Sequence, residues 1–274
     1  MKYRFMRFPD FKTKAVTFSY DDGAKTDKNV IEILDKYGFF GTFNIHGSAL
    51  SRTDAYSLTP DEFKTIYNRH EIANHGAQHT ALIKTSMIDG ISEVLEGRKI
   101  LEQFYSKIIK GFAYPDIGKT SDEIKTYLKM LGISYARTTL STHSFNMPSD
   151  WLEWNATCKH DDEKLMDLCE DFINTDPLKK YVSSRDSILF YVWGHSWELE
   201  GKWHVLEDFC KKLATENDIW KATNIEIYEY TEAYKRLVFS ADNKIVYNPT
   251  NITIYYEEDK ENKVIGSFET KIYN

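Results

Sequence analysis

The sequence predicts an α/β fold, a distorted (β/α) barrel of seven or eight parallel strands with a small C-terminal β appendage. Three observations support this prediction. Short apolar segments rich in β-branched and aromatic residues alternate with segments of helical apolar spacing. Seven such strand-then-helix units follow one another, which favours a parallel barrel over a sandwich or a helical bundle. Aspartate and histidine residues also follow several predicted strands, where barrels of this class carry their functional groups.

The first two units show how the elements are recognised. Residues 14–20 (KAVTFSY) have the composition of a strand, and residues 26–38 have helical apolar spacing before a glycine. The second helix begins with a capping box, in which Thr59 is the N-cap, Pro60 lies in the first turn and Glu62 completes the box. The same reasoning predicts later strands at 40–45, 70–75, 108–115, 133–139, 187–195 and 219–224, and helices at 59–69, 86–106, 121–132, 163–173, 204–215 and 225–237.

Two segments depart from this alternation. Residues 140–161, which include Trp151 and Trp154, have no clear period. From about Phe239 the chain has short segments of alternating apolar and polar residues, which indicate antiparallel strands. We therefore predict a barrel over residues 1–238 and a short β-rich extension over 239–274, packed on the same domain.

Composition narrows the functional classes. The chain has 274 residues, 42% of them hydrophobic and 28% charged, which is ordinary for a globular protein. The formal charge is 35 − 42 = −7, so we expect no nucleic-acid partner. Three cysteines without a CxxC pair predict free thiols. Neither a signal peptide nor a membrane-spanning stretch is recognisable, which predicts a protein without a membrane span that is cytoplasmic, with a chain already trimmed of its signal peptide as the alternative; the oligomeric state is left open.

The first candidate motif is Asp21-Asp22-Gly23, directly after the first predicted strand. Adjacent side chains of a strand point in opposite directions, so both carboxylates can face one site only where the chain leaves strand geometry. The glycine makes such a turn inexpensive. In isolation, however, this tripeptide is more typical of a solvated turn.

The second motif places two imidazoles four residues apart, at His75 and His79, a spacing that lets both bind one zinc ion. Gly76 stands where metalloproteases of this spacing have a glutamate, so the third ligand and the base must come from elsewhere. The two acids of the first motif can supply one of each. Two unrelated loop histidines are the alternative interpretation of this pair alone.

The third motif ends the most apolar strand, where Trp193, His195 and Trp197 share one face for as long as the strand continues. A histidine between two indoles suits a proton carrier beside a sugar-binding surface. The alternative is a core histidine with packing tryptophans. His46 and His160 are further candidates to line the pocket.

Together these motifs resemble those of the polysaccharide deacetylase family, carbohydrate esterase family four. The resemblance extends over residues 14–197, with the motifs in the family's order. It implies a distorted strand-and-helix barrel that binds a divalent ion, with zinc expected and other transition ions open. The implied roles are catalytic base for Asp21, metal ligands for Asp22, His75 and His79, general acid for His195, and substrate contacts for Trp193 and Trp197.

Two further motifs of the family match less closely. The third usually reads Arg-x-Pro, but this chain has Ala113 in place of the arginine that orients the catalytic base. Tyr114 is matched to the position whose backbone N–H helps to bind the oxyanion. The fourth motif, an aspartate and a tryptophan that tune the acid histidine, corresponds either to Asp150 and Trp151 or to the segment 154–160.

The resemblance thus implies a metal-dependent hydrolase that removes N-acetyl or O-acetyl groups from an amino sugar, an oligosaccharide or a polysaccharide. The altered third motif leaves a second enzyme function open, hydrolysis of a non-sugar amide or cyclic imide on the same metal site. A third possibility, from a different class, is a catalytically silent carbohydrate-binding protein. Measurement of bound metal and of acetate released from chitin oligomers would separate the three.

Overall fold

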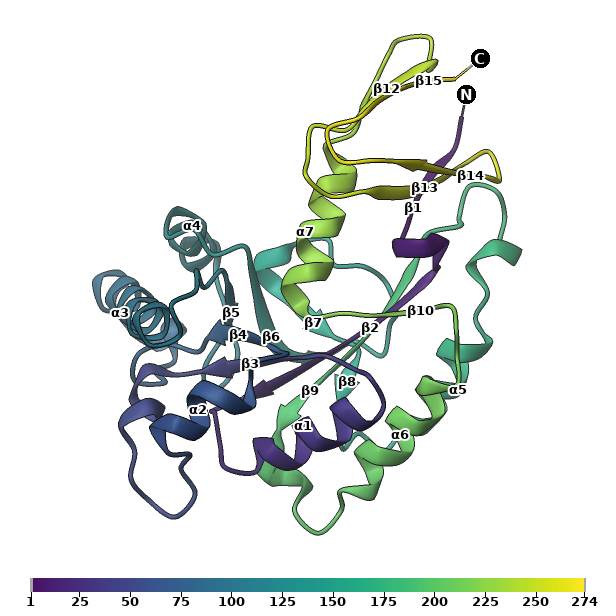
Figure 1. Ribbon diagram of the computed structural model, residues 1–274. Coiled ribbons are helices and arrows are strands. Elements are labelled where there is room, and N and C mark those ends of the chain that lie inside the picture. The colour runs from purple at the N-terminus through teal and green to yellow at the C-terminus, as the bar shows by residue number, and fades with distance from the viewer. Residues whose placement is uncertain (1, 274) are drawn as a thin grey trace.

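The computed structural model describes residues 2–273, so the two ends of the predicted ranges 1–238 and 239–274 lie outside it. Eight strands form one parallel sheet in the spatial order β7-β6-β5-β4-β3-β2-β9-β8 (Figure 1). The predicted α/β fold is confirmed. The strands are β2 (Lys14–Asp21), β3 (Gly41–Ile45), β4 (Glu71–Asn74), β5 (Gly111–Ala113), β6 (Tyr135–Ser141), β7 (Trp154–Ala156), β8 (Cys158–Lys159) and β9 (Ile188–His195).

The segment from β7 to β8 closes the barrel. β7 pairs with β6 on one side, and β8 pairs with β9 on the other. Between them, Thr157 donates its backbone N–H to the carbonyl of Tyr191 on β9 at 2.8 Å. This stretch therefore joins the two edges of the sheet. The sequence shows no strand period there because each of its strands has only two or three residues. A further short strand, β10 (Ile219–Lys221), pairs with the beginning of β2.

Helices cover the outside of the sheet (Figure 1). They bury apolar side chains against it. Val30 and Leu34 of α1, for example, are fully buried. The capping box predicted for α2 is present, since the Thr59 hydroxyl accepts from Glu62 N–H (3.3 Å) and the Glu62 carboxylate accepts from Thr59 N–H (2.8 Å). The helices are α1 (Asp27–Lys36), α2 (Pro60–Ile66), α3 (Met87–Tyr105), α4 (Asp122–Met130), α5 (Leu165–Asn174), α6 (His204–Ala214) and α7 (Asn224–Lys235).

Two small antiparallel sheets lie near the C-terminal end of α7, which extends from the barrel (Figure 1). The N-terminal strand belongs to one of them, because its residues 4–7 pair with residues 255–258. A buried ion cluster ties this sheet to the barrel: Glu257 accepts from Arg7 at 2.9 Å and from Arg185 at 2.6 Å. The strands are β1 (Arg4–Arg7), β13 (Ile254–Glu258) and β14 (Glu261–Ile265) in one sheet, and β11 (Val238–Phe239), β12 (Ile245–Tyr247) and β15 (Thr270–Ile272) in the other.

Between residues 2 and 273, no helix is both long enough and apolar enough to span a lipid bilayer.

Candidate active site

The candidate site lies at the carboxyl ends of the barrel strands, as the alternation of elements predicts. Strand β2 ends at Asp21, which is in register with Asn44 of β3 on one side and with His195 of β9 on the other. His75 directly follows β4, the next strand beyond β3. Parallel pairing therefore brings the three motifs, which are far apart in the sequence, to one rim of the barrel.

The three predicted metal ligands converge. The ligand atoms of Asp22, His75 and His79 all lie within 4.8 Å of one another. Oδ1 of Asp22 is 3.7 Å from Nε2 of His75 and 3.4 Å from Nε2 of His79. One carboxylate oxygen and two imidazole nitrogens form a donor set suited to zinc or a similar divalent ion.

The unsatisfied polar atoms support this interpretation. Oδ1 of Asp22 is buried and has no hydrogen-bond partner among the residues described, which is costly unless a cation binds there. Nδ1 of His75 donates to the carbonyl of Ala113 at 2.8 Å, so its Nε2 is directed towards the site. The residues present therefore fit a divalent metal ion.

The backbone leaves strand geometry where the sequence predicts it. Asp22 has φ = +80° and Gly23 has φ = +68°, both in the left-handed region that glycine and aspartate tolerate best. Asp22 N–H still donates to the carbonyl of Asn44 at 3.0 Å, which fixes the turn. This turn lets Asp21 and Asp22 face the same space.

A carboxylate from α3 holds the loop between the two histidine ligands. Oε1 of Glu93 accepts hydrogen bonds from the backbone N–H groups of Gln78 (2.8 Å) and Thr80 (3.0 Å). Gly76 has φ = +86°, and a Cβ there would lie 2.5 Å from Oε1 of Glu93. The glycine thus makes room for the glutamate that shapes the loop around His79.

Asp21 has a buried guanidinium partner even though Ala113 occupies the arginine position of the third motif. Arg137 of β6 is fully buried and donates from Nη2 to Oδ2 of Asp21. Asn44 Nδ2 donates to the other oxygen at 2.8 Å. Burial alone would raise the pKa of Asp21, but Arg137 together with His75 and His195 lowers it below its ordinary value. Asp21 is therefore ionised and able to accept a proton.

His195 faces the same space from β9. Its Nε2 lies 4.0 Å from Oδ2 of Asp21 and 3.9 Å from Oδ2 of Asp22. Burial alone would lower the pKa of His195, but the hydrogen bond with Glu198 and the charges of the two aspartates raise it above its ordinary value. The environment thus keeps Asp21 charged as a base and favours the protonated form of His195 as an acid.

The two tryptophans of the third motif have different surroundings. Trp193 is only 7% exposed, and the guanidinium of Arg137 lies over its ring, 4.4 Å from the centroid. Trp197 is 50% exposed. Trp197 can therefore contact a ligand with its ring, whereas Trp193 supports Arg137.

The expectation for Tyr114 is corrected by the structure. Its backbone N–H donates to the carbonyl of Arg137 at 3.0 Å as part of the β5–β6 pairing. The side chain is buried, and its hydroxyl donates to the carbonyl of Leu152 at 2.6 Å. Because the N–H is already bonded within the sheet, Tyr114 is not available to bind an oxyanion.

Neither the aspartate nor the tryptophan suggested for the fourth motif contacts His195. Asp150 pairs with Lys125 at 3.1 Å, and Trp151 donates to Glu232 at 2.8 Å. From the alternative segment 154–160, His160 lies behind the site, 3.4 Å from Glu198. The carboxylate that holds His195 is thus Glu198, a residue that the motif comparison does not identify.

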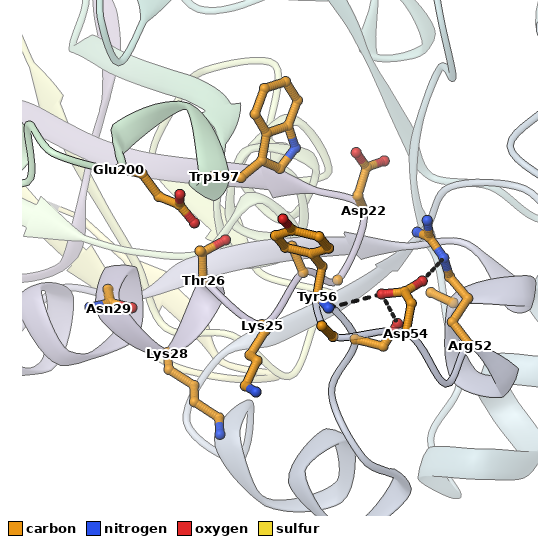
Figure 2. A pocket seen from close by; sticks show the side chains of 15 residues that line it. Asp22, Lys25, Thr26, Lys28, Asn29, Arg52, Asp54, Tyr56, Trp197 and Glu200 are labelled. Carbon is orange, nitrogen blue, oxygen red and sulfur yellow. Dashed lines mark hydrogen bonds and ion pairs between the residues drawn. The ribbon is translucent and has the colours of Figure 1, made fainter.

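Figure 2 shows a cavity that opens beside Asp22, with Tyr56 and Trp197 projecting towards it. Its volume is about 780 Å³, which is large enough for a sugar unit. Tyr56 is 77% exposed, so both aromatic rings are accessible. A second, smaller cavity of about 370 Å³ borders the metal-type site and is lined by Asp22, His46, Ser48, Arg52 and His79.

Fold and site together define a class: an α/β barrel with a three-residue site of metal-ligand type beside an aspartate–histidine pair. Residues 9–136 match the family model described as polysaccharide deacetylase. The chain is also 25% identical over 123 residues to the peptidoglycan-N-acetylmuramic acid deacetylase PdaC of Bacillus subtilis (strain 168). This match covers 44% of the chain and only 25% of that relative's length. The predicted resemblance to the polysaccharide deacetylase family is therefore confirmed.

Solved structures show the same fold. A predicted polysaccharide deacetylase from Mycobacterium smegmatis has a TM-score of 0.63 and 20% identity, over 83% of this chain and 93% of that one. A pseudoenzyme of carbohydrate esterase family four from Bacillus anthracis has a TM-score of 0.53 and 15% identity, over 82% of this chain and 68% of that one. Since a pseudoenzyme has this fold, the question of activity depends on the side chains of the site and not on the fold.

Proposed function

We propose that the protein is a metal-dependent deacetylase that hydrolyses the N-acetyl amide, or an O-acetyl ester, of an amino sugar in a saccharide chain. The observation that carries the proposal is the arrangement of Asp21 and His195. Their environments shift their pKa values in opposite directions, and both face the three-residue metal-type site from neighbouring strands. A binding module needs no such acid–base pair.

Each residue has a defined task in this hydrolysis. Asp21 accepts a proton from the water that attacks the acetyl carbonyl carbon, because Arg137 and Asn44 keep its carboxylate ionised and fixed. His195 donates the proton that the leaving nitrogen needs when the C–N bond breaks. Acetic acid, which ionises to acetate, and a free amino sugar are the products, and transfer of the proton from Asp21 to His195 returns both residues to their starting protonation states.

Asp22, His75 and His79 would hold the divalent ion. Such an ion, when bound, would polarise the acetyl carbonyl and make a bound water more acidic. Zinc is the expected ion because the donor set contains two imidazoles and one carboxylate.

The cavity beside Asp22 supports a carbohydrate substrate. Sugars commonly bind to exposed aromatic rings that carry polar neighbours, and Tyr56 and Trp197 provide such rings next to the metal-type site (Figure 2). The relative from Bacillus subtilis is a deacetylase of N-acetylmuramic acid in peptidoglycan. An acetylated amino sugar of a polysaccharide is therefore the substrate class we propose.

The test combines metal analysis with product analysis. The purified protein is loaded with Zn²⁺, its metal content is measured, and acetate release is followed from chitin oligomers, from peptidoglycan and from acetylated xylan. Acetate release that disappears in the Asp21→Asn variant supports the proposal. Bound metal with turnover of a cyclic imide but no acetate would instead indicate the second enzyme function. Saccharide binding without any turnover would indicate a silent binding protein.

A further inference from the structure

The acid histidine is held by a carboxylate three residues further along the chain. Glu198 lies in the 3-10 helix η6 (Ser196–Leu199), and its Oε2 accepts from the backbone N–H of His195 at 3.0 Å. The same oxygen lies 3.2 Å from Nδ1 of His195. Nδ1 therefore donates to Glu198, which leaves Nε2 of His195 directed towards Asp21 and Asp22.

Two further side chains hold Glu198 from the other side. Nζ of Lys159 donates to Oε1 at 2.5 Å, and Nε2 of His160 lies 3.4 Å from Oε2. His160 is fully buried. A Cβ at Gly194 would lie 2.4 Å from the His160 ring, so glycine at this position lets the imidazole pack directly against the backbone of β9.

The charges make this arrangement rigid. Burial alone would raise the pKa of Glu198, but the neighbouring side chain of His160 and the hydrogen bonds from His195 and Lys159 keep it well below its ordinary range. The carboxylate cannot rotate without breaking at least one charge-assisted hydrogen bond. His195 is therefore held to Glu198 at two points, through its backbone N–H and through Nδ1 of its ring.

We propose that Glu198, supported by His160 and Lys159, is the positioning residue of the general acid His195, in place of the aspartate expected from the fourth motif. This inference rests on the function proposed above. It assigns the role to a carboxylate in the same turn as the acid, whereas Asp150 pairs with Lys125. The tautomer of the His195 ring and the direction of its Nε2 are then set by two nearby elements, η6 with Glu198 and β8 with Lys159.

The chemistry of the leaving group makes the inference testable. When an amide is hydrolysed, the C–N bond breaks as the proton moves from Nε2 of His195 to the nitrogen, because an unprotonated amine anion is a very poor leaving group. A 4-nitrophenyl ester releases a stable phenolate and needs no such proton. A misplaced general acid therefore slows amide hydrolysis and leaves ester hydrolysis almost unchanged.

The experiment compares Glu198→Gln and Glu198→Asp in the zinc-loaded protein, with an N-acetylated chitin oligomer and with 4-nitrophenyl acetate. For Glu198→Gln we expect kcat on the amide to fall on the order of 100-fold, with KM within about twofold and the ester rate within about threefold. Glu198→Asp, which keeps the charge, should recover part of the amide rate. The matched control is Glu170→Gln, which also removes a carboxylate paired with a lysine, Lys212, on the surface.

Equal losses on amide and ester, or no loss on the amide, would overturn the inference. A measurement on the unaltered protein does not depend on folding of a variant: ¹⁵N NMR of the neutral His195 ring should show the Nδ1–H tautomer. The Nε2–H tautomer would contradict the role of Glu198. If the unaltered protein releases no acetate from any saccharide, the proposed function fails, whereas the tautomer measurement still tests the positioning by itself.

Discussion

Arg137 and Asp21 form a buried ion pair between two strands that are not neighbours in the barrel. Asp21 ends β2, whose neighbours are β3, β9 and β10, whereas Arg137 lies on β6 between β5 and β7. The guanidinium therefore crosses the barrel interior to reach the carboxylate. It supplies the positive charge that the third motif, with Ala113 in the arginine position, lacks.

Removal of the guanidinium should affect both stability and activity. Arg137→Ala leaves the carboxylate of Asp21 buried without its cation, which we expect to reduce the free energy of unfolding by about 3–5 kcal/mol. The double variant Arg137→Ala/Asp21→Asn should recover a large part of this loss, because it no longer buries an unpaired charge. Urea denaturation measures the effect in both variants. Arg98→Ala is the control, because its partner Glu102 is partly exposed. A double variant no more stable than Arg137→Ala would contradict the pairing.

Asp21→Asn separates catalysis from metal binding. The amide cannot accept a proton, so we expect acetate release to fall by about 100-fold to 10,000-fold. The metal content should stay unchanged, because Asp22, His75 and His79 keep their donor atoms. Metal analysis and acetate release on the same preparation test both statements. An Asp21→Asn variant that retains turnover would show that another group is the base.

The positions of the motifs could be predicted from the sequence, because strand ends in a parallel barrel meet at one rim. Asp22, His75 and His79 converge as expected. The roles of Arg137 and Glu198 could not be predicted, since each role depends on a contact in the folded protein and not on a periodic pattern in the sequence. Signals for both were nevertheless present: Arg137 is a charge inside a buried strand, and Glu198 lies three residues after the acid histidine. The closing strands β7 and β8 were too short to give a pattern.

Removal of a metal ligand should reduce the rise in unfolding temperature that bound Zn²⁺ gives. Ligands that bind only the native state raise the unfolding temperature as their concentration rises, so Zn²⁺ should stabilise the unaltered protein. Asp22→Asn weakens the site by removing its negative charge, and we expect the Zn²⁺-dependent shift to be reduced or lost. Calorimetry with and without Zn²⁺ measures this shift. The exposed Asp61→Asn serves as the control, and an undiminished shift in Asp22→Asn would exclude Asp22 as a ligand.

A substitution at Gly76 tests how the loop between His75 and His79 is held in place. Gly76→Ala introduces a left-handed alanine and a Cβ that would lie 2.5 Å from Oε1 of Glu93. Gly201→Ala is a matched control, because Gly201 has φ = +78° but nothing within 4 Å of its added Cβ. We expect both variants to lose about 1–2 kcal/mol through the backbone, and only Gly76→Ala to weaken Zn²⁺ affinity as well. Equal affinities in the two variants would mean that the contact with Glu93 does not shape the site.

Asp27 should make stability depend on pH near neutrality. Its carboxylate is buried at the start of α1, where it accepts hydrogen bonds from Tyr67 (2.6 Å) and from Ser196 (2.5 Å), the residue after His195. Burial raises the pKa of Asp27 from 3.8 to about 7, with Asp22 and Asp21 adding to the shift. The folded state therefore holds this proton more tightly than the unfolded state does.

The direction of the pH dependence follows from this difference in pKa between the folded and unfolded states. Stabilisation from protonated Asp27 is complete below the unfolded pKa and is lost as the pH rises through about 7, at up to about 1.4 kcal/mol per pH unit. Asp27→Asn cannot ionise, so its free energy of unfolding, relative to the unaltered protein, should increase between pH 5 and pH 8. Urea denaturation at both values measures the change, with Asp61→Asn as an exposed control. If the difference between Asp27→Asn and the unaltered protein is the same at both pH values, Asp27 does not titrate in this range.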